Sequence, residues 1–463
     1  MNFNRREFVR CGLATLGFLA LPGGLFAVPA GWKPKKKANL VVGVMSDTHL
    51  MVGWNGRSPH KGFPLTYVRN AFELFKARGV DAVVHCGDAA HRGAVREWEF
   101  HKEVFEDVFG KQGTGVPEKI IIVGNHELFG ENARIRKIWR DPAAWAENAI
   151  CADLPRHYER VWGEPFAGVF HKEVKGYHFF GRHWGVGEQQ QADMILRMAE
   201  ECSLKGAKPF FILSHLRNHF KTNHALRAFP NAIAFFGHFH TSNADWKTIY
   251  YDSFGGFFPN IEIGACRMDG GNCFDYTGES SLKVKAEGDE RTYHNNKVKS
   301  RQAMVVNVYD DMVVFERHEV GLGGKLGPDW VLPLGQHKPS PFSREKLKKT
   351  IGTPEFGKKA KLVVEKGTQA TIKIKIPLAD GNPDSRVFAY DVVVVGDDPK
   401  TRFFKSVYFE GCNVAPEHAP NNGITEVEIP AAELPAGKKL TIAVRPISSL
   451  GTKGKTIGTT WRV

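Results

Sequence analysis

Five short apolar runs of this 463-residue chain each end directly in residues that can bind metal ions. A lone His after such a run is more often structural than functional, but five such endings in succession are not explained by chance. Carboxylate, amide and imidazole groups without thiolate suit ions such as Fe, Mn or Zn, and they do not discriminate among them. The endings, in chain order, are Asp47-Thr48-His49, Gly87-Asp88, Gly124-Asn125-His126-Glu127, Ser214-His215 and Gly237-His238-Phe239-His240.

The runs before these residues have the length and composition of buried β-strands. Apolar residues at helical spacing separate them, for example between residues 68 and 75, where Gly79 follows as a C-terminal cap. Continuous apolar strands that alternate with helices predict an α/β domain whose sheets are covered on both faces. Ligands bind such sheets at the carboxyl ends of the strands, so we expect the five endings to meet in one metal centre. The expected strands are 40–45, 81–86, 119–123, 210–213 and 233–236, with a less regular insertion over 131–176.

The five endings resemble the pattern of the calcineurin-like metallophosphoesterases, which reads D-x-H, G-D, G-N-H-[DE], a lone His and G-H-x-H. The similarity covers roughly residues 40–245. It implies a four-layer sandwich of two β-sheets flanked by helices, with a binuclear metal centre inside. The ligands that it implies are Asp47, His49 and His240 for one ion, Asn125, His215 and His238 for the other, and Asp88 as the bridge between both.

The implied chemistry accounts for these residue types. Two ions about 3.5–4 Å apart need a shared anion, and a carboxylate can bridge them where a neutral His cannot. A water that bridges both ions becomes hydroxide near neutral pH and attacks phosphorus in line, while the ions offset charge in the transition state. We therefore expect hydrolysis of phosphate mono- or diesters. His219 and His224 are alternatives to His215, but only His215 directly follows an expected strand.

Two further residues are predicted to be catalytic. His126 resembles the family's catalytic histidine, which protonates the leaving oxygen or stabilises charge on phosphorus; the alternative is a structural role. Arg92 stands in a segment similar to the protein phosphatase motif G-D-x-x-D-R-G, whose Arg holds the substrate phosphate. His91 replaces the second Asp of that motif, which would partner the catalytic His, so that dyad is absent. The alternative for Arg92 is an exposed residue at a helix start. Glu127 is expected to orient its neighbours.

The motifs also differ from those of other branches of the family. The Tyr that purple acid phosphatases carry soon after G-D is absent, since Ala90 and His91 stand there. The compact spacing looks closer to bacterial cyclic-nucleotide phosphodiesterases. A small or nucleotide-like phosphodiester is favoured over a protein phosphoester, because the protein phosphatase features are broken at His91 and at residues 214–217.

The N-terminal 30 residues look like a twin-arginine export signal. Arg5 and Arg6 precede an apolar stretch, 11–21, which is shorter than the about 20 residues needed to span a bilayer. Val28-Pro29-Ala30 fits a cleavage site, so we expect export to the periplasm or the cell exterior and no stable membrane span in the mature chain. A retained N-terminal anchor is the alternative.

The second half of the chain predicts another fold. We expect the metallophosphoesterase domain over 38–337, a Lys- and Pro-rich linker over 338–353, and a β-sandwich over 354–463. Short strands at even spacing with Gly, Pro and Asn turns support the sandwich, which resembles a fibronectin type III module. No candidate site lies in it.

The net charge of +13 favours anionic partners without choosing among them. Nucleic acid is not favoured, because no arginine-rich run or stacking-aromatic motif concentrates the charge. Seven Cys without a CxxC pair do not fit a zinc ribbon. The alternatives to a small-molecule phosphoesterase are a non-catalytic binding protein on the same scaffold and an extracellular nuclease.

Overall fold

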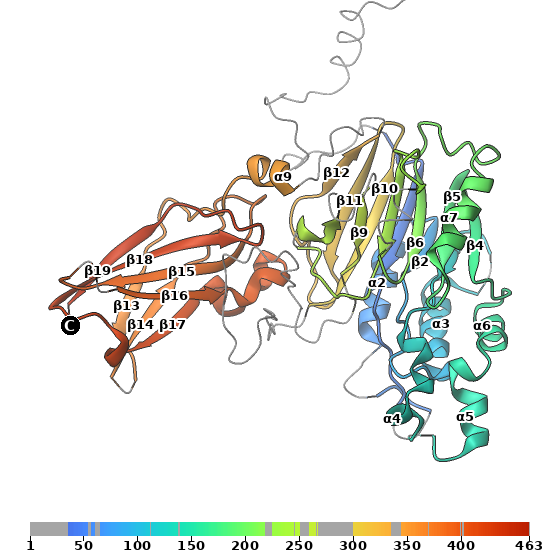
Figure 1. The fold of residues 1–463 in the computed structure, drawn as a ribbon, viewed down its shortest axis with the longest axis horizontal. Coiled ribbons are helices and arrows are strands. Elements are labelled where there is room, and N and C mark those ends of the chain that lie inside the picture. Colours follow the sequence, from blue (N-terminus) through green and yellow to red (C-terminus); the bar gives the residue numbers. More distant parts are fainter. Residues whose placement is uncertain are drawn as a thin grey trace, which may run out of the picture.

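The chain forms a larger α/β domain and a smaller all-β domain (Figure 1). The expected export signal and the alternatives His219 and His224 lie outside the described residues. Among the described residues, no helix is long and apolar enough to cross a membrane. The computed structural model describes residues 36–53, 57–60, 65–111, 113–137, 139–217, 225–244, 246–250, 259–264, 266, 300–334, 344–368, 370–398, 400 and 402–462.

The first sheet of the α/β domain has six strands in the spatial order β12-β11-β10-β1-β2-β3. Strands β1, β2 and β3 run parallel, whereas β10, β11 and β12 pair antiparallel. Strands β1 and β2 are buried along almost their whole length because helices cover one face of the sheet and a second sheet covers the other. The strands are β1 Leu40–Met45, β2 Ala82–His85, β3 Glu118–Ile121, β10 Gln302–Val308, β11 Met312–Glu319 and β12 Trp330–Pro333.

The second sheet also has six strands, in the order β4-β5-β6-β7-β9-β8. Its four central strands are parallel, and the edge strands β4 and β8 are antiparallel to their neighbours. The strands are β4 Val169–Val174, β5 Tyr177–Arg182, β6 Phe210–Ser214, β7 Ala232–Phe236, β8 Ile249–Tyr250 and β9 Asn260–Glu262.

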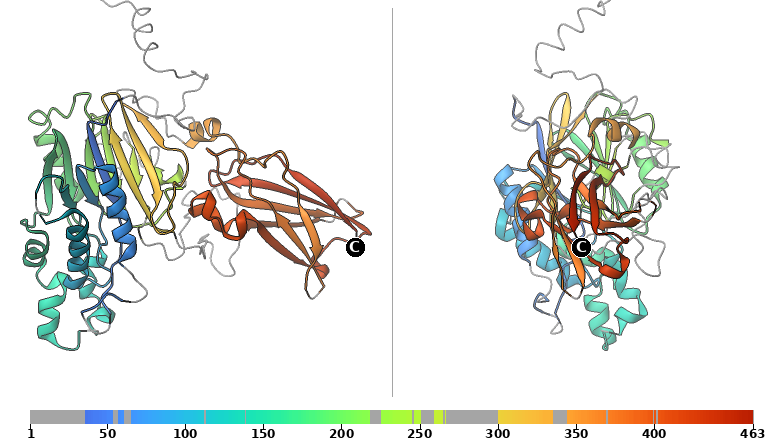
Figure 2. Two further views of the ribbon diagram at one scale, coloured as in Figure 1. Left: turned by 180° about the vertical axis from the view of Figure 1, so that it is seen from behind. Right: turned by 90° about the vertical axis from the view of Figure 1, so that its left-hand side faces the viewer.

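One hydrophobic core joins the inner faces of the two sheets. In it, Phe235 of β7 packs edge-on against Phe315 of β11, with ring centroids 6.3 Å apart. Helices α2 (Thr66–Arg78) and α3 (Val95–Phe109) pack on the outer face of the first sheet, and α7 (Glu188–Arg197) packs on that of the second (Figures 1 and 2). This arrangement confirms the four-layer α/β sandwich expected from the sequence.

The segment expected to be an irregular insertion folds mainly into short helices. Two of them begin at Asp residues whose side chains accept a backbone N–H of the first turn, Asp141 from Ala143 and Asp153 from Arg156. A Pro follows each Asp within two residues, which is a helix-start signal that hydrophobic periodicity alone does not reveal. The helices are α4 Ala133–Arg136, α5 Pro142–Asn148, η2 Ile150–Ala152 (3₁₀) and α6 Leu154–Trp162, and η1 His126–Glu131 (3₁₀) precedes them.

The C-terminal region is all-β, as expected. Two antiparallel sheets, ordered β13-β14-β17 and β16-β15-β18-β19, enclose a core of their own. Helix α9 (Arg344–Thr350) lies within the predicted linker, and its Leu347 is buried in the core of the larger domain. The strands are β13 Val363–Lys366, β14 Thr371–Ile376, β15 Val387–Val395, β16 Arg402–Tyr408, β17 Thr425–Pro430, β18 Lys439–Ser448 and β19 Ile457–Arg462. Short 3₁₀ helices are η3 Trp246–Thr248, η5 Glu410–Asn413, η6 Pro416–His418, η7 Pro420–Gly423 and η8 Ala431–Glu433.

Candidate metal centre

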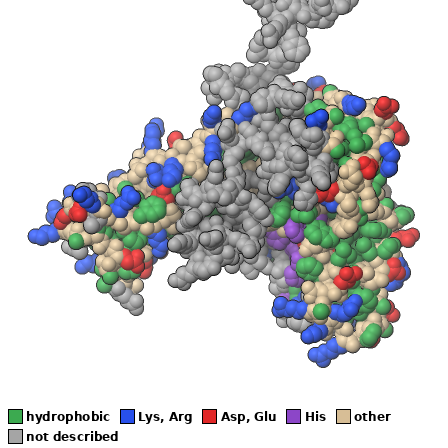
Figure 3. Space-filling model, in the orientation of Figure 1, with side chains coloured by type: hydrophobic (Ala, Val, Ile, Leu, Met, Phe, Trp, Pro, Cys, Tyr) green, Lys and Arg blue, Asp and Glu red, His purple; other side chains and the backbone are tan. Residues whose placement is uncertain are grey.

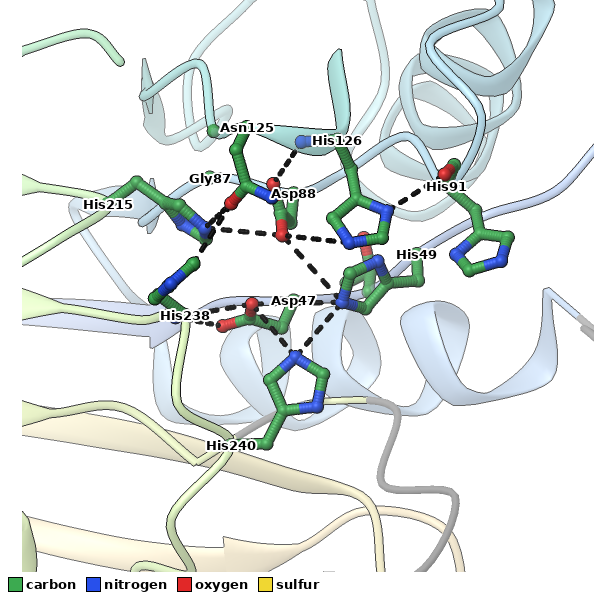
Figure 4. Close-up of polar contacts among 12 residues, drawn as sticks. Asp47, His49, Gly87, Asp88, His91, Asn125, His126, His215, His238 and His240 are labelled. Carbon is green, nitrogen blue, oxygen red and sulfur yellow. Dashed lines mark hydrogen bonds and ion pairs between the residues drawn. The ribbon is translucent and has the colours of Figure 1, made fainter. Parts of the chain in front are cut away.

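The structure brings all five strand endings together at the carboxyl ends of parallel strands from both sheets (Figure 4). Strands β1, β2 and β3 of the first sheet and β6 and β7 of the second supply them. The cluster can be reached by solvent, since the side chains of His126 and His240 are 21% and 26% exposed. Figure 3 likewise shows histidine side chains gathered at the surface of the larger domain.

One group of side chains contains Asp47, His49 and His240. The Nε2 atoms of His49 and His240 lie 3.0 Å apart. Oδ1 of Asp47 lies 3.2 Å from Nε2 of His240 and 3.7 Å from Nε2 of His49. Three potential ligand atoms therefore converge on one point, as the predicted first metal position requires.

The second group contains Asn125, His215 and His238. Oδ1 of Asn125 lies 3.0 Å from Nε2 of His215 and 3.0 Å from Nδ1 of His238. The opposite ring nitrogen of His215, Nδ1, donates to the carbonyl of Cys86 at 2.8 Å. A hydrogen bond of this kind fixes the orientation of most metal-ligating histidines, because it leaves the other nitrogen facing the ion.

Asp88 lies between the two groups. Its Oδ1 accepts the backbone N–H of His126 at 2.9 Å. Its Oδ2 lies 3.2 Å from Nε2 of His215 and 3.8 Å from Nε2 of His49, so this single oxygen faces both groups.

The electrostatics of the cluster favour bound cations. Asp47 and Asp88 are buried; although burial raises their pKa values, the adjacent imidazoles His240 and His215 respectively draw them below the ordinary range. Burial lowers the pKa of His215, but the charge of Asp88 outweighs it and raises the pKa to about 10. The buried carboxylates Asp47 and Asp88 thus favour a proton on His215, which supplies compensating positive charge. A bound metal ion can supply that positive charge instead. The donor set therefore fits a pair of metal ions.

The backbone of the cluster is held in an unusual conformation. Ten non-glycine residues have positive φ among those described, and half of them belong to this cluster. Each such residue costs about 1–3 kcal/mol and persists only where the surrounding structure enforces it. The cluster members are Asp47 (φ 52°), His49 (44°), Asp88 (57°), His238 (78°) and His240 (57°).

The glycines of the motifs are explained by close packing around the ligands. A Cβ on Gly124 would lie 2.2 Å from Oδ1 of Asp88, and one on Gly237 would lie 2.4 Å from Oδ2 of Asp47. Such distances lie far inside normal contact, so any larger residue would displace the carboxylates.

His126 is oriented by a backbone carbonyl. Its Nδ1 lies 2.8 Å from the carbonyl oxygen of His91, which can only accept, so Nδ1 carries the proton. Nε2 then faces the cluster, 3.9 Å from Oδ2 of Asp88. His126 therefore has a hydrogen-bond partner although His91 replaces the Asp of the protein phosphatase motif. Burial lowers the pKa of His126.

Two buried carboxylates hold the loops beneath the cluster. Glu127 was expected to orient its neighbours, and it accepts the backbone N–H groups of Asp88, Ala90 and Gly124. Sequence reasoning missed Glu97, which accepts the N–H groups of Val52, His91, Arg92 and Ala94. A capping-box pattern would have drawn attention to Glu97, but Ala94 stands where Ser or Thr would complete that pattern.

Arg92 and Trp184 lie at the margin of the cluster. The side chain of Arg92 is half-buried, and its backbone N–H donates to Glu97 at 2.9 Å, so its role in binding phosphate stays a prediction. Trp184 was not expected; its ring centroid is 5.4 Å from that of His238 and 5.8 Å from that of His215. It follows β5, which is parallel to β6, so the strand-end rule applied to β5 would have found it.

Comparison with known proteins gives one family match. The family model of the calcineurin-like phosphoesterases matches residues 40–242. No protein with a curated description matches the chain.

Solved structures show similarity at low identity. A dimetal phosphatase from Danio rerio is 12% identical, with a TM-score of 0.35, over 64% of this chain and 99% of that one. A purple acid phosphatase from yellow lupin is 12% identical, with a TM-score of 0.39, over 65% of this chain and 55% of that one. A 5'-nucleotidase precursor from Thermus thermophilus is 12% identical, with a TM-score of 0.29, over 67% of this chain and 58% of that one.

The family match covers all five strand endings that form the cluster. Residues 40–242 of this chain therefore form a calcineurin-like metallophosphoesterase domain.

Proposed function

We propose that this chain is an exported hydrolase of small phosphate esters that works with two metal ions. The observation that carries the proposal is the position of Asp88, whose Oδ2 faces both ligand groups. A carboxylate so placed suits the shared ligand of two cations.

Seven side chains are proposed to hold the ions, in the two groups described above with Asp88 common to both. When bound, the two ions supply a nucleophile from water at neutral pH and offset the charge that develops on the phosphoryl oxygens. Mn, Fe and Zn all fit the donor set. Asn125 contributes a neutral oxygen, so its ion keeps more of its positive charge.

The chain's own proton donor is proposed to be His126. Because Nδ1 donates to the carbonyl of His91, the protonated ring presents its second N–H, at Nε2, to the cluster. A leaving oxygen within hydrogen-bond reach of this N–H can take up the proton as the P–O bond breaks. Arg92 is proposed to bind the substrate phosphate.

The proposed substrate is a small or nucleotide-like phosphodiester. The departure from the protein phosphatase motif at His91 argues against a protein phosphoester. The Trp184 ring beside His238 and His215 offers an apolar face to the organic part of such a substrate.

The test uses the mature protein, stripped of metal and reloaded with Mn, Fe or Zn. Hydrolysis of paired chromogenic phosphate mono- and diesters is measured for the wild type and for Asp88→Asn, which keeps the shape of the side chain but removes its charge. We expect turnover that requires metal, is faster on the diester and is lost in Asp88→Asn. Retained metal-independent turnover, or wild-type activity in Asp88→Asn, would contradict the proposal.

Export and the fibronectin type III-like character of the C-terminal region belong to the same proposal. The twin-arginine pattern at Arg5 and Arg6 supports export. Replacement of both by Lys is expected to retain the protein in the cytoplasm, as judged by cell fractionation. Unchanged export of the Lys variant would contradict this part.

A further inference from the structure

A second cluster of metal-binding side chains lies outside the candidate metal centre. It contains His171 of β4, His178 of β5 and Cys202 in the turns that follow α7. One ligand atom from each residue lies within 4.8 Å of those from the other two. None of these residues belongs to the motifs of the phosphoesterase domain.

The strand register explains how two of them meet. In the antiparallel pair of β4 and β5, His171 is opposite Phe180 and Glu173 is opposite His178. Alternate residues of a strand share a face, so all four side chains project from the same face of the hairpin. Phe180 packs there against residues of α7, and Cys202 belongs to the same hydrophobic cluster. Helix α7 covers this face of the hairpin (Figure 1). The thiol of Cys202 approaches the two imidazoles from the turns that follow α7.

The distances suit a small coordination sphere. Nε2 of His171 lies 3.0 Å from Nδ1 of His178, and Oε2 of Glu173 lies 4.0 Å from the same Nδ1. In a tetrahedral zinc site, with Zn–N about 2.0–2.1 Å and Zn–S about 2.3 Å, ligand atoms lie about 3.3–3.7 Å apart. Small side-chain adjustments would reach this geometry. The ring of His171 is already fixed by stacking on Phe180, with centroids 4.8 Å apart.

The charges around the cluster favour a cation. Burial and the neighbouring His178 lower the pKa of His171, and burial lowers the pKa of His178. Burial raises the pKa of the Cys202 thiol, and the charges of Glu201 and Glu173 raise it further. A bound cation reverses this effect, because a coordinating thiol is deprotonated.

We propose that His171, His178 and Cys202 bind one Zn²⁺ ion, with Glu173 as the fourth ligand. Thiolate and imidazole together suit Zn²⁺, whereas Mn²⁺ prefers oxygen ligands. On binding, the Cys202 thiol releases its proton to solvent and its sulfur donates an electron pair to the ion. The ion then ties the edge hairpin of the second sheet to the turns after α7.

The test uses the full chain, reduced and stripped of metal, with Co²⁺ as a spectroscopic probe for Zn²⁺. We expect a near-ultraviolet thiolate-to-cobalt charge-transfer band that is displaced by Zn²⁺. The predicted binuclear centre has no thiolate ligand, so the band reports on the second cluster alone. Cys202→Ser and His171→Gln are expected to abolish the band and to lower the number of Zn²⁺ ions bound per chain by one.

Two control variants separate the sites. Asp88→Asn weakens the binuclear centre and should leave the band intact. Cys151→Ser removes a half-buried thiol elsewhere and should also leave it intact. The proposal is overturned if Co²⁺ gives no such band, if the band survives in Cys202→Ser, or if His171→Gln binds Zn²⁺ as the wild type does. Those results would assign the His171–His178 contact to an ordinary hydrogen bond.

Discussion

Replacing Gly124 by Ala is expected to disable the metal centre through a single methyl group. A Cβ at this position would lie 2.2 Å from Oδ1 of Asp88 and 2.5 Å from its backbone nitrogen. Ordinary contacts begin at about 3.4 Å, so Asp88 must retreat by about 1 Å. Gly124 does not have a positive φ, so Ala adds no backbone strain of its own and the effect is steric.

The magnitude follows from the position of Asp88. Its Oδ2 lies 3.2 Å from Nε2 of His215 and 3.8 Å from Nε2 of His49, and a shift of about 1 Å breaks this arrangement at both groups. Misplacement of a reacting group by 1 Å costs about 10²-fold in rate. Overpacking costs about 1–3 kcal/mol of folding stability, which a domain of this size can tolerate.

The assay compares metal content, hydrolysis of a chromogenic phosphate diester and thermal unfolding for Gly124→Ala and the wild type. The control is Gly187→Ala, because a Cβ at Gly187 would meet nothing closer than 4.0 Å and its φ is −64°. We expect loss of bound metal and of at least about 99% of activity in Gly124→Ala, and neither loss in the control. A folded Gly124→Ala variant with two bound ions and near wild-type activity would refute the steric reasoning.

Three further outcomes are expected. His126→Ala should lower kcat by about 10²–10⁴-fold, and more for alkyl than for nitrophenyl leaving groups, with metal content unchanged; an equal loss for all leaving groups would exclude proton donation. Burial raises the pKa of Glu316, but the hydrogen bond with His318 and the charges of Lys325 and Arg78 outweigh it and lower the pKa to about 2. The ionised Glu316 therefore stabilises the folded state; this contribution is complete above the ordinary pKa of 4.5 and is lost as the pH falls towards 2. Glu316→Gln should accordingly lower the free energy of unfolding by about 1–2 kcal/mol at pH 7 and by almost nothing near pH 2. Equal destabilisation at both pH values in denaturant titrations would show that charge is not the cause. Chelation of the metal ions should lower the Tm as well as abolish activity, because ions that bind only the folded state stabilise it; an unchanged Tm would indicate that the ions are not held in the fold.

The side chains that meet at the candidate metal centre could be predicted from the sequence because each stands beside a strong local signal. The apolar runs before Asp47, Asp88 and His215 predict buried strands, and parallel strands deliver their carboxyl ends to one edge. Glycines within the motifs add a second signal, since they mark positions where a side chain would collide with a ligand. The apolar runs and the motif glycines are both visible in the residues next to each predicted side chain.

What the sequence did not reveal depends on contacts between distant segments. Glu97 accepts hydrogen bonds from backbone N–H groups of the loops beside it, and these partners cannot be predicted from residue types. The carbonyl of His91 orients His126 whatever the side chain at 91, so its role is invisible to residue type. His171 and Cys202 meet only because the register of one hairpin and the path after α7 bring them together.

The most direct test of the central claim is a titration of the metal-free protein with Mn²⁺, with hydrolysis of a chromogenic phosphate ester measured at each step. Mn²⁺ suits the oxygen and imidazole ligands of the binuclear centre and disfavours the thiolate cluster. The account predicts activity that reaches its maximum at two ions per chain, and no activity in Asp88→Asn at any Mn²⁺ equivalence. Full activity at one ion per chain, or in Asp88→Asn, would contradict a centre in which Asp88 joins two metal ions.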